Sequence, residues 1–96
     1  MKTKEEVLTL ISGVMHPAIN YSLTDLGIVK EINMNENTAE VLFAFPFPGI
    51  PIAEVLVNSI AQPILSEGIE FKYKIDLMTP EEKDKFMKME AEGWKG

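Results

Sequence analysis

The 96 residues predict a fold of the α+β class: a two-layer α/β sandwich in which helices cover one face of a small mixed three-stranded sheet. Apolar residues recur at three- and four-residue steps in three segments and alternate with polar residues in three others. Their order is helix, strand, strand, helix, strand, helix. A helix between the second and third strands indicates a right-handed crossover, which makes those two strands parallel. The length suits a single domain over residues 1–96.

The first segment is expected to be a helix from Thr3 to Met15, with one apolar face. Glu6 has capping-box spacing from Thr3. Because Pro17 disfavours helical backbone angles at the residue before it, the helix should end there and an extended loop should run to Leu26.

Two alternating segments, residues 28–34 and 39–45, predict antiparallel strands in a hairpin. The loop between them should contain three to five residues, with Asn35 or Asn37 in the left-handed conformation. Lys30 is the polar exception on its face, so we expect it near a sheet edge with its aliphatic stem over apolar surface.

A Pro/Gly turn should end the second strand near Phe45, because proline cannot donate to a sheet ladder and Gly49 can adopt backbone angles closed to other residues. Pro51 suits the first turn of the helix that follows. Free amide N–H groups and the positive end of the helix dipole would then lie at residues 49–53, where an anion can bind. Capping by water or a neighbouring carbonyl is the simpler alternative.

The second helix should bury one face, and Pro63 should kink it or end its regular part. The third strand shows the clearest alternation in the chain and should have one solvated face. The helix face comprises Ile52, Val55, Leu56, Ser59, Ile60 and Ile64, and the strand alternates Ile69, Phe71, Tyr73, Ile75 and Leu77 with Glu70, Lys72, Lys74 and Asp76.

A marginal C-terminal helix is expected over about residues 79–92, because Thr79 and Glu82 repeat the capping box with Pro80 at the first helical position. Trp94 should either pack against the domain, which we favour, or contact a partner.

Composition excludes several classes of function. The net charge of −6, with no arginine, argues against nucleic acid as a partner. No apolar run approaches the length of a membrane span, and the N-terminus lacks a signal-peptide pattern, so we expect no membrane association and a cytoplasmic protein. With no cysteine and a single histidine, His16, disulfides, thiolate metal sites and thiol nucleophiles are excluded, and no cofactor is expected.

Two motifs at a characteristic spacing resemble those of a known family: Asp25-Leu26-Gly27-Ile28-Val29 before the first strand and Pro48-Gly49-Ile50-Pro51-Ile52-Ala53 before the second helix. The chain resembles the SufT/PaaD-type iron–sulfur cluster assembly domain from about Glu5 to Pro80. The resemblance implies a role in the maturation of iron–sulfur proteins (metal-sulfur cluster biosynthesis), with protein partners drawn from assembly factors or their clients.

The chain departs from this family at its polar positions. His16 stands where the resemblance places an aspartate and Ala18 where it places a glutamate. Pro46 and Phe47 replace two threonines, and Ile50 replaces the reactive cysteine. Since isoleucine has neither charge nor lone pair, we expect a domain that no longer ligates a cluster. We expect an adaptor rather than an enzyme, and no catalytic residues.

The expected ligand or partner surface comprises Asp25, Gly27, Phe47, Pro48, Gly49, Ile50 and Pro51. Exposure of the apolar residues in the turn would favour a protein interface, including a homodimer; burial under the C-terminal helix and Trp94 is an equal alternative. Another hypothesis is an anion, small-molecule or metal-binding domain, or minor enzyme, using the second helix's N-terminus with Asp25 and His16. Each of these two residues also has a simpler role. A lone histidine in a loop is usually only hydrogen-bonded, which makes His16 a weak metal candidate, and Asp25 should cap its loop.

Overall fold

The computed structural model describes residues 3–95 and contains the predicted elements in the predicted order. They are α1 (Lys4–Ile11), β1 (Val29–Asn35), β2 (Thr38–Phe45), α2 (Ala53–Ser66), β3 (Glu70–Leu77) and α3 (Pro80–Gly93).

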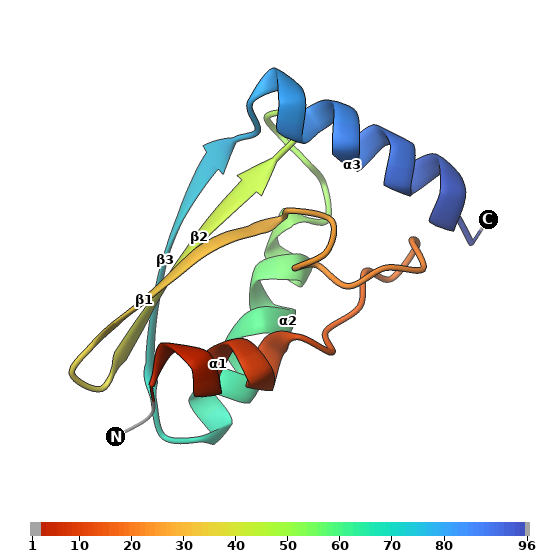
Figure 1. Ribbon diagram of the computed structural model, residues 1–96. Helices are drawn as coiled ribbons and strands as arrows, with labels where there is room; N and C mark the ends of the chain where they lie inside the picture. Colours follow the sequence, from red (N-terminus) through yellow and green to blue (C-terminus); the bar gives the residue numbers. More distant parts are fainter. Residues whose placement is uncertain (1–2, 96) are drawn as a thin grey trace.

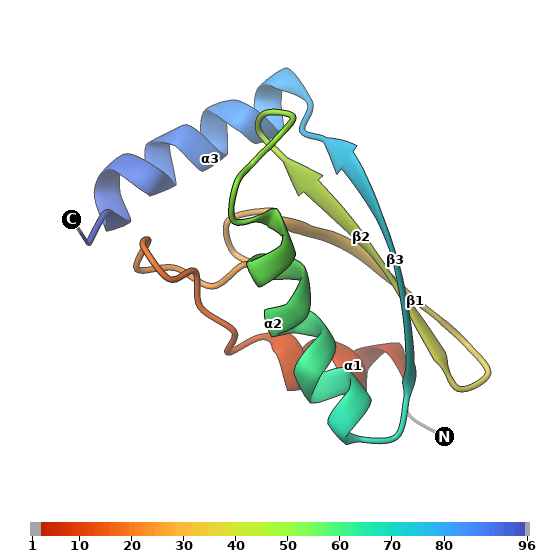
Figure 2. The ribbon, with the colours of Figure 1, turned by 180° about the vertical axis from the view of Figure 1, so that it is seen from behind.

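The three strands form one mixed sheet with β2 in the centre. β1 pairs antiparallel with β2, and β3 pairs parallel with β2, as the crossover through α2 requires. α1 and α2 lie on the same side of the sheet, whereas α3 crosses beyond the ends of β2 and β3 (Figures 1 and 2). The predicted fold class is confirmed.

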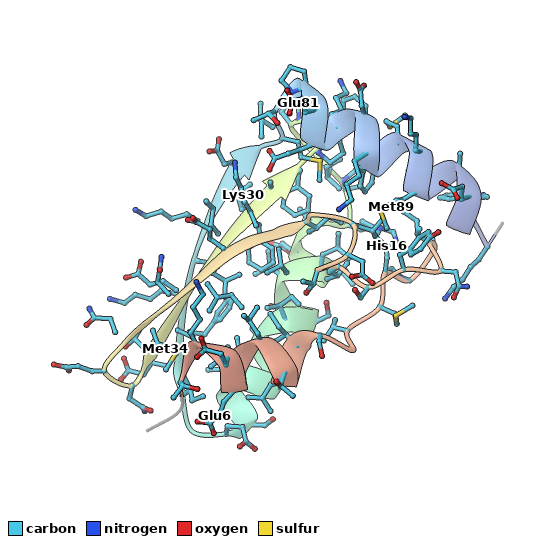
Figure 3. All side chains as sticks on the ribbon, in the orientation of Figure 1. Glu6, His16, Lys30, Met34, Glu81 and Met89 are labelled. Carbon is cyan, nitrogen blue, oxygen red and sulfur yellow. The ribbon has the colours of Figure 1, made fainter. Side chains whose placement is uncertain are left out.

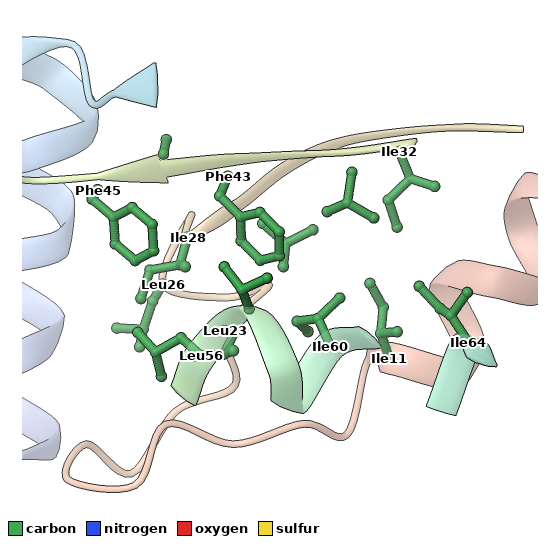
Figure 4. Packing of buried hydrophobic residues seen from close by; sticks show 14 of the residues in the cluster. Ile11, Leu23, Leu26, Ile28, Ile32, Phe43, Phe45, Leu56, Ile60 and Ile64 are labelled. Carbon is green, nitrogen blue, oxygen red and sulfur yellow. The ribbon is translucent and has the colours of Figure 1, made fainter. Parts of the chain in front are cut away.

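The core lies between the inner face of β1 and β2 and the two covering helices (Figure 4). Phe43 is fully buried and stacks on Phe45 with ring centroids 6.3 Å apart. Other large side chains that are almost fully buried include Ile11, Ile19, Leu23, Leu26, Ile28, Ile32, Leu56, Ile60 and Ile64.

The first helix is shorter than expected, since it ends at Ile11 rather than Met15. The capping box of Thr3 is present. After Ile11 the chain turns, with the Val14 N–H donating to the Ile11 carbonyl at 3.0 Å. Met15 instead forms an antiparallel bridge with Ser22, so contacts within the long loop replace the last turn of helix.

The hairpin loop also differs from expectation. Asn35 pairs directly with Thr38, so the loop has two residues, and Glu36 adopts the left-handed conformation with φ of 57°. Asn37 has another role: its side-chain amide donates to the Gly68 carbonyl at 2.8 Å and ties the hairpin to the turn between α2 and β3.

Lys30 lies in an edge strand, as predicted, and it is the extra residue of an irregularity in the β1–β2 ladder. Val29 pairs with Phe43 and Glu31 with Leu42, which leaves Lys30 unpaired between them. Its ammonium group lies 3.4 Å from the Glu82 carboxylate and so links β1 to α3.

α2 begins at Ala53, so Pro51 precedes the helix instead of occupying its first turn. The helix continues through Pro63 to Ser66. Val55, expected on the buried face, is exposed, and Val57 is buried in its place. The buried residues Leu56, Val57, Ile60, Ala61 and Ile64 follow three- and four-residue steps that leave Val55 outside.

β3 forms as predicted, and Phe71 is half-buried against the core, but the rest of its apolar face is about half exposed. Tyr73, Ile75 and Leu77 are 50%, 51% and 51% exposed. α2 presents Ala61 and other short side chains towards this strand, and they leave a groove of about 390 Å³. The groove is lined by Ala53, Glu54, Val57, Asn58, Ala61 and Leu65 of α2 and by Phe71, Tyr73 and Ile75 of β3.

Candidate partner-binding site

The turn between β2 and α2, residues 46–52, has the backbone shape that its prolines and glycine predict. β2 ends at Phe45, and Gly49 has a φ of 68°, a conformation that side-chain-bearing residues rarely adopt. The N-cap residue of α2, Ile52, makes no side-chain cap hydrogen bond. The Ala53 N–H donates to the Ile50 carbonyl at 3.1 Å, so a neighbouring carbonyl satisfies one helix-start amide.

The apolar residues of this turn divide between core and surface. Ile50 and Ile52 are half-buried and pack against the core. Phe47 is 42% exposed, and the Lys83 ammonium lies 4.3 Å from the centre of its ring, a cation–π contact from α3. Pro48, Gly49 and Pro51 are exposed beside it. The turn therefore presents one aromatic side chain on a surface shaped by proline and glycine.

Trp94 does not cover the turn, and the expectation that its side chain packs against the domain is wrong. The indole is 56% exposed, whereas the Trp94 backbone bridges to Ile19 in the long loop. The Asn20 N–H donates to the Gly93 carbonyl at 2.6 Å. Backbone hydrogen bonds thus link the end of α3 to the long loop, while Phe86 of the same helix is buried in the core.

His16, labelled in Figure 3, lies in the long loop and is almost fully buried. Its Nδ1 accepts a hydrogen bond from the Ala18 N–H at 3.0 Å. Burial lowers the pKa of the imidazole; Glu90 opposes this shift, and Lys95 adds to it. Burial thus favours the neutral form of His16, which shapes its own loop through Nδ1.

Asp25 and Gly27 occupy the turn that leads into β1. Asp25 is exposed, and its backbone N–H donates to the Ser22 hydroxyl oxygen at 3.0 Å. Ser22 thus caps this turn, and within residues 3–95 the Asp25 carboxylate makes no cap of the kind expected. Gly27 has a φ of 82° and donates to the Thr24 carbonyl at 3.1 Å, while Leu26 between them is buried in the core.

The structure does not bring these residues together as a metal centre. Within residues 3–95 no group of three or more His, Cys, Asp or Glu side chains is placed to hold a metal ion. His16 already uses Nδ1 in its loop, and Ile50 offers no ligand atom. Because iron–sulfur clusters are held chiefly by cysteine thiolates, the residues present do not fit a cluster.

Sequence reasoning missed the groove between α2 and β3. Its signal is the recurrence of Ala53, Val57 and Ala61 at four-residue steps, which places short side chains along one stripe of the helix. Alternation in β3 showed which side chains share a face but not whether that face is covered.

The model of the iron–sulfur cluster assembly protein family matches residues 4–67, two thirds of the chain. The chain belongs to this family. The match includes the turn into β1 and the turn before α2, and it ends before β3.

Among solved structures, the fold is similar to the crystal structure of a domain of unknown function, DUF59, from Bacillus anthracis. The TM-score is 0.62 at 16% identity, over 78% of this chain and 73% of that one. A comparison with curated proteins found no match. No helix within residues 3–95 is long and apolar enough to cross a membrane.

Proposed function

We propose that this family member is a non-enzymatic accessory domain for iron–sulfur protein maturation in the cytoplasm. It acts through protein contacts at the 46–52 turn and holds no cluster of its own. One observation carries the proposal. Ile50, at the position where the resemblance places a reactive cysteine, packs half-buried against the core, while Phe47 in the same turn remains exposed.

Adaptor function fits this arrangement better than ligand chemistry does. An apolar side chain exposed on a turn fixed by proline and glycine can insert into a partner's pocket with little loss of backbone entropy. Glu54 in the first turn of α2 opposes an anion at the helix start. His16 already uses Nδ1 within its loop, and within residues 3–95 no three His, Cys, Asp or Glu side chains are grouped to hold a metal ion, which favours the adaptor role.

The part of the proposal that concerns clusters is tested by anaerobic reconstitution with iron and sulfide. We expect no cluster absorbance to remain after desalting, because four soft ligands are normally needed. Stoichiometric absorbance that survives desalting would contradict the proposal.

The adaptor role is tested in a strain that lacks the gene, by assaying the activity of a host iron–sulfur enzyme. Wild-type protein should restore the activity and Phe47→Glu should not, since a carboxylate there cannot enter an apolar pocket. Met15→Glu is the matched control, because Met15 is 45% exposed and lies in another loop. Full activity without the gene would exclude the pathway, and full rescue by Phe47→Glu would exclude the turn as the contact surface.

A further inference from the structure

β3 is an open sheet edge that lacks several of the usual protections against pairing, although it carries charged residues on one face. It runs for eight residues in unbroken register with β2, has no bulge and contains no proline. Natural edge strands are normally short, charged, interrupted or covered. Here the groove beside α2 and the exposed side chains of Tyr73, Ile75 and Leu77 add apolar surface to the open edge.

The backbone of β3 shows which peptide groups face outward. The Glu70 N–H donates to the Asn37 carbonyl and the Met78 N–H to the Phe45 carbonyl, both at 2.8 Å. Even-numbered residues therefore direct their backbone polar groups to β2, and odd-numbered residues direct theirs away from it. The outward groups belong to Phe71, Tyr73, Ile75 and Leu77, and the Leu77 N–H turns to the Asp76 carboxylate at 2.8 Å.

We propose that β3 pairs antiparallel with β3 of a second copy of this chain, with the two-fold axis at Lys74. The pairing joins two three-stranded sheets into one of six strands. Outward backbone groups of Tyr73 would meet those of Ile75 in the second copy, and Phe71 would meet Leu77. The apolar faces of the two strands become continuous, and each extends the other's groove beside α2.

We infer a second copy as the partner because the charged face of β3 is complementary to the same face of another β3 in antiparallel orientation. These residues are Glu70, Lys72, Lys74 and Asp76. With the axis at Lys74, each Lys72 lies opposite Asp76 of the second copy, giving two opposite-charge pairs against one Lys74–Lys74 pair. An axis at Tyr73 would oppose only like charges, which destabilises a pair of strands.

An axis at Lys72 would also create two opposite-charge pairs, between Glu70 and Lys74, but it fits less well. It leaves Leu77 outside the paired segment with its apolar side chain exposed. The axis at Lys74 uses all four apolar residues of the strand.

Sedimentation of the full chain over about 1 µM to 1 mM tests the dimer directly. We expect twice the monomer mass of 10.8 kDa at the upper concentrations. Ile75→Glu should raise the dissociation constant at least about tenfold, the equivalent of about 1.4 kcal/mol. Met15→Glu, with a similarly exposed apolar residue in the long loop, should not change it. A wild-type monomer throughout this range, or an unchanged dimer in Ile75→Glu, would overturn the proposal.

The absence of cysteine from the chain allows the axis to be located by single substitutions. Lys74→Cys places one thiol opposite itself in a non-hydrogen-bonded pair, with Cα atoms about 4.5 Å apart, within disulfide range. Mild oxidation should crosslink this variant faster than Lys72→Cys, Tyr73→Cys or the α3 control Lys88→Cys. Faster crosslinking of Lys72→Cys or Tyr73→Cys would overturn the Lys74 axis. Equal rates for all four would show random collision and overturn the interface.

The interface and the proposed function are separable. Failure of the sedimentation and crosslinking tests would leave the role of the turn intact, because Phe47 does not belong to β3. Failure of the gene-deletion assay would leave the dimer intact.

Discussion

The 46–52 turn and the β3 edge differ in what defines them. The turn lies within the segment matched by the family model, yet it exposes one large apolar side chain, Phe47. The β3 edge lies outside that segment and exposes Tyr73, Ile75 and Leu77 together with outward backbone groups. The family model covers the turn, whereas the β3 edge is marked by apolar area that the packing of α2 leaves uncovered.

The clearest contrast within one layer is between Phe43 and Ile75, which are paired neighbours on the same face of the sheet. Phe43 is fully buried beneath the helices, while Ile75 is half exposed at the edge. One step across the sheet therefore separates core from surface.

The largest expected effect is a difference in the free energy of unfolding between substitutions at these two positions. Phe43→Ala should lower the free energy of unfolding by about 3–5 kcal/mol, because it leaves a cavity in the core. Ile75→Ala, measured at concentrations where the protein is monomeric, should cost less than about 1 kcal/mol. Urea unfolding of both variants measures the difference, and similar costs would show that the β3 face is covered after all.

The sequence predicted the element order and the fold class because periodicity, capping boxes and turn residues are local. Thr3, Thr79 and Gly49 act through neighbours within a few positions, and the structure bears out both capping boxes and the positive φ of the glycine. Local pattern could not give the end of α1, which depends on Met15 bridging Ser22 across the loop. It also could not give the exposure of β3, which depends on the short side chains of another element.

The candidate site was predicted less completely for the same reason. The backbone-shaping residues Gly27 and Gly49 could be assigned from the sequence, since positive φ favours glycine. The cap by Ser22 and the burial of His16 depend on loop contacts that no periodic pattern records. The size of the Trp94 side chain predicted packing against the domain, but the Trp94 backbone, through its bridge to Ile19, makes the contact with the long loop.

The next largest effect tests whether α3 and the β3 edge behave independently. Gly93→Ala should destabilise the protein by about 1–3 kcal/mol, because the new Cβ would lie 2.8 Å from two ring carbons of Tyr21 and 3.2 Å from the Asn20 nitrogen. The β3 dimer should persist in this variant, as Gly93 lies outside that strand.

Gly13→Ala provides the control, since nothing lies within 4 Å of its added Cβ. Thermal unfolding and sedimentation together measure both effects. Loss of the dimer in a folded Gly93→Ala protein would show that the two surfaces are coupled.

A smaller effect should appear with pH at His16, on the α3 side of the molecule. Because burial lowers its pKa in the folded state, the unfolded chain binds more protons as pH falls below about 6.5. The contribution of His16 to stability is therefore present above that pH and is lost as pH falls through the folded-state pKa.

His16→Asn retains a hydrogen-bond acceptor for the Ala18 N–H without the titrating ring. Urea midpoints at pH 7.5 and 5.5 should differ less for this variant than for the wild type. An equal or larger difference would show that His16 is not the titrating group.

The smallest expected effect tests whether the 46–52 turn retains the electrostatics of a helix start. Ile50→Cys should give a thiol whose pKa lies modestly below the ordinary value of about 8.5, because the nearby N-terminus of α2 favours a thiolate. The depression should be small for three reasons. The Ala53 N–H is already bonded to the carbonyl of residue 50, the core packing withholds water, and Glu54 adds negative charge in the first turn.

Asn58→Cys, at an exposed position on the same helix, is the reference. Iodoacetamide alkylation rates measured against pH give both values, and one pKa unit corresponds to about 1.4 kcal/mol. A lower pKa at position 50 would indicate that the turn keeps the helix-start field even though its side chain has become apolar. A value equal to or above the reference would mean that this field is absent. The correspondence between Ile50 and a reactive cysteine would then have to be withdrawn, leaving the β3 edge as the better-supported interaction surface.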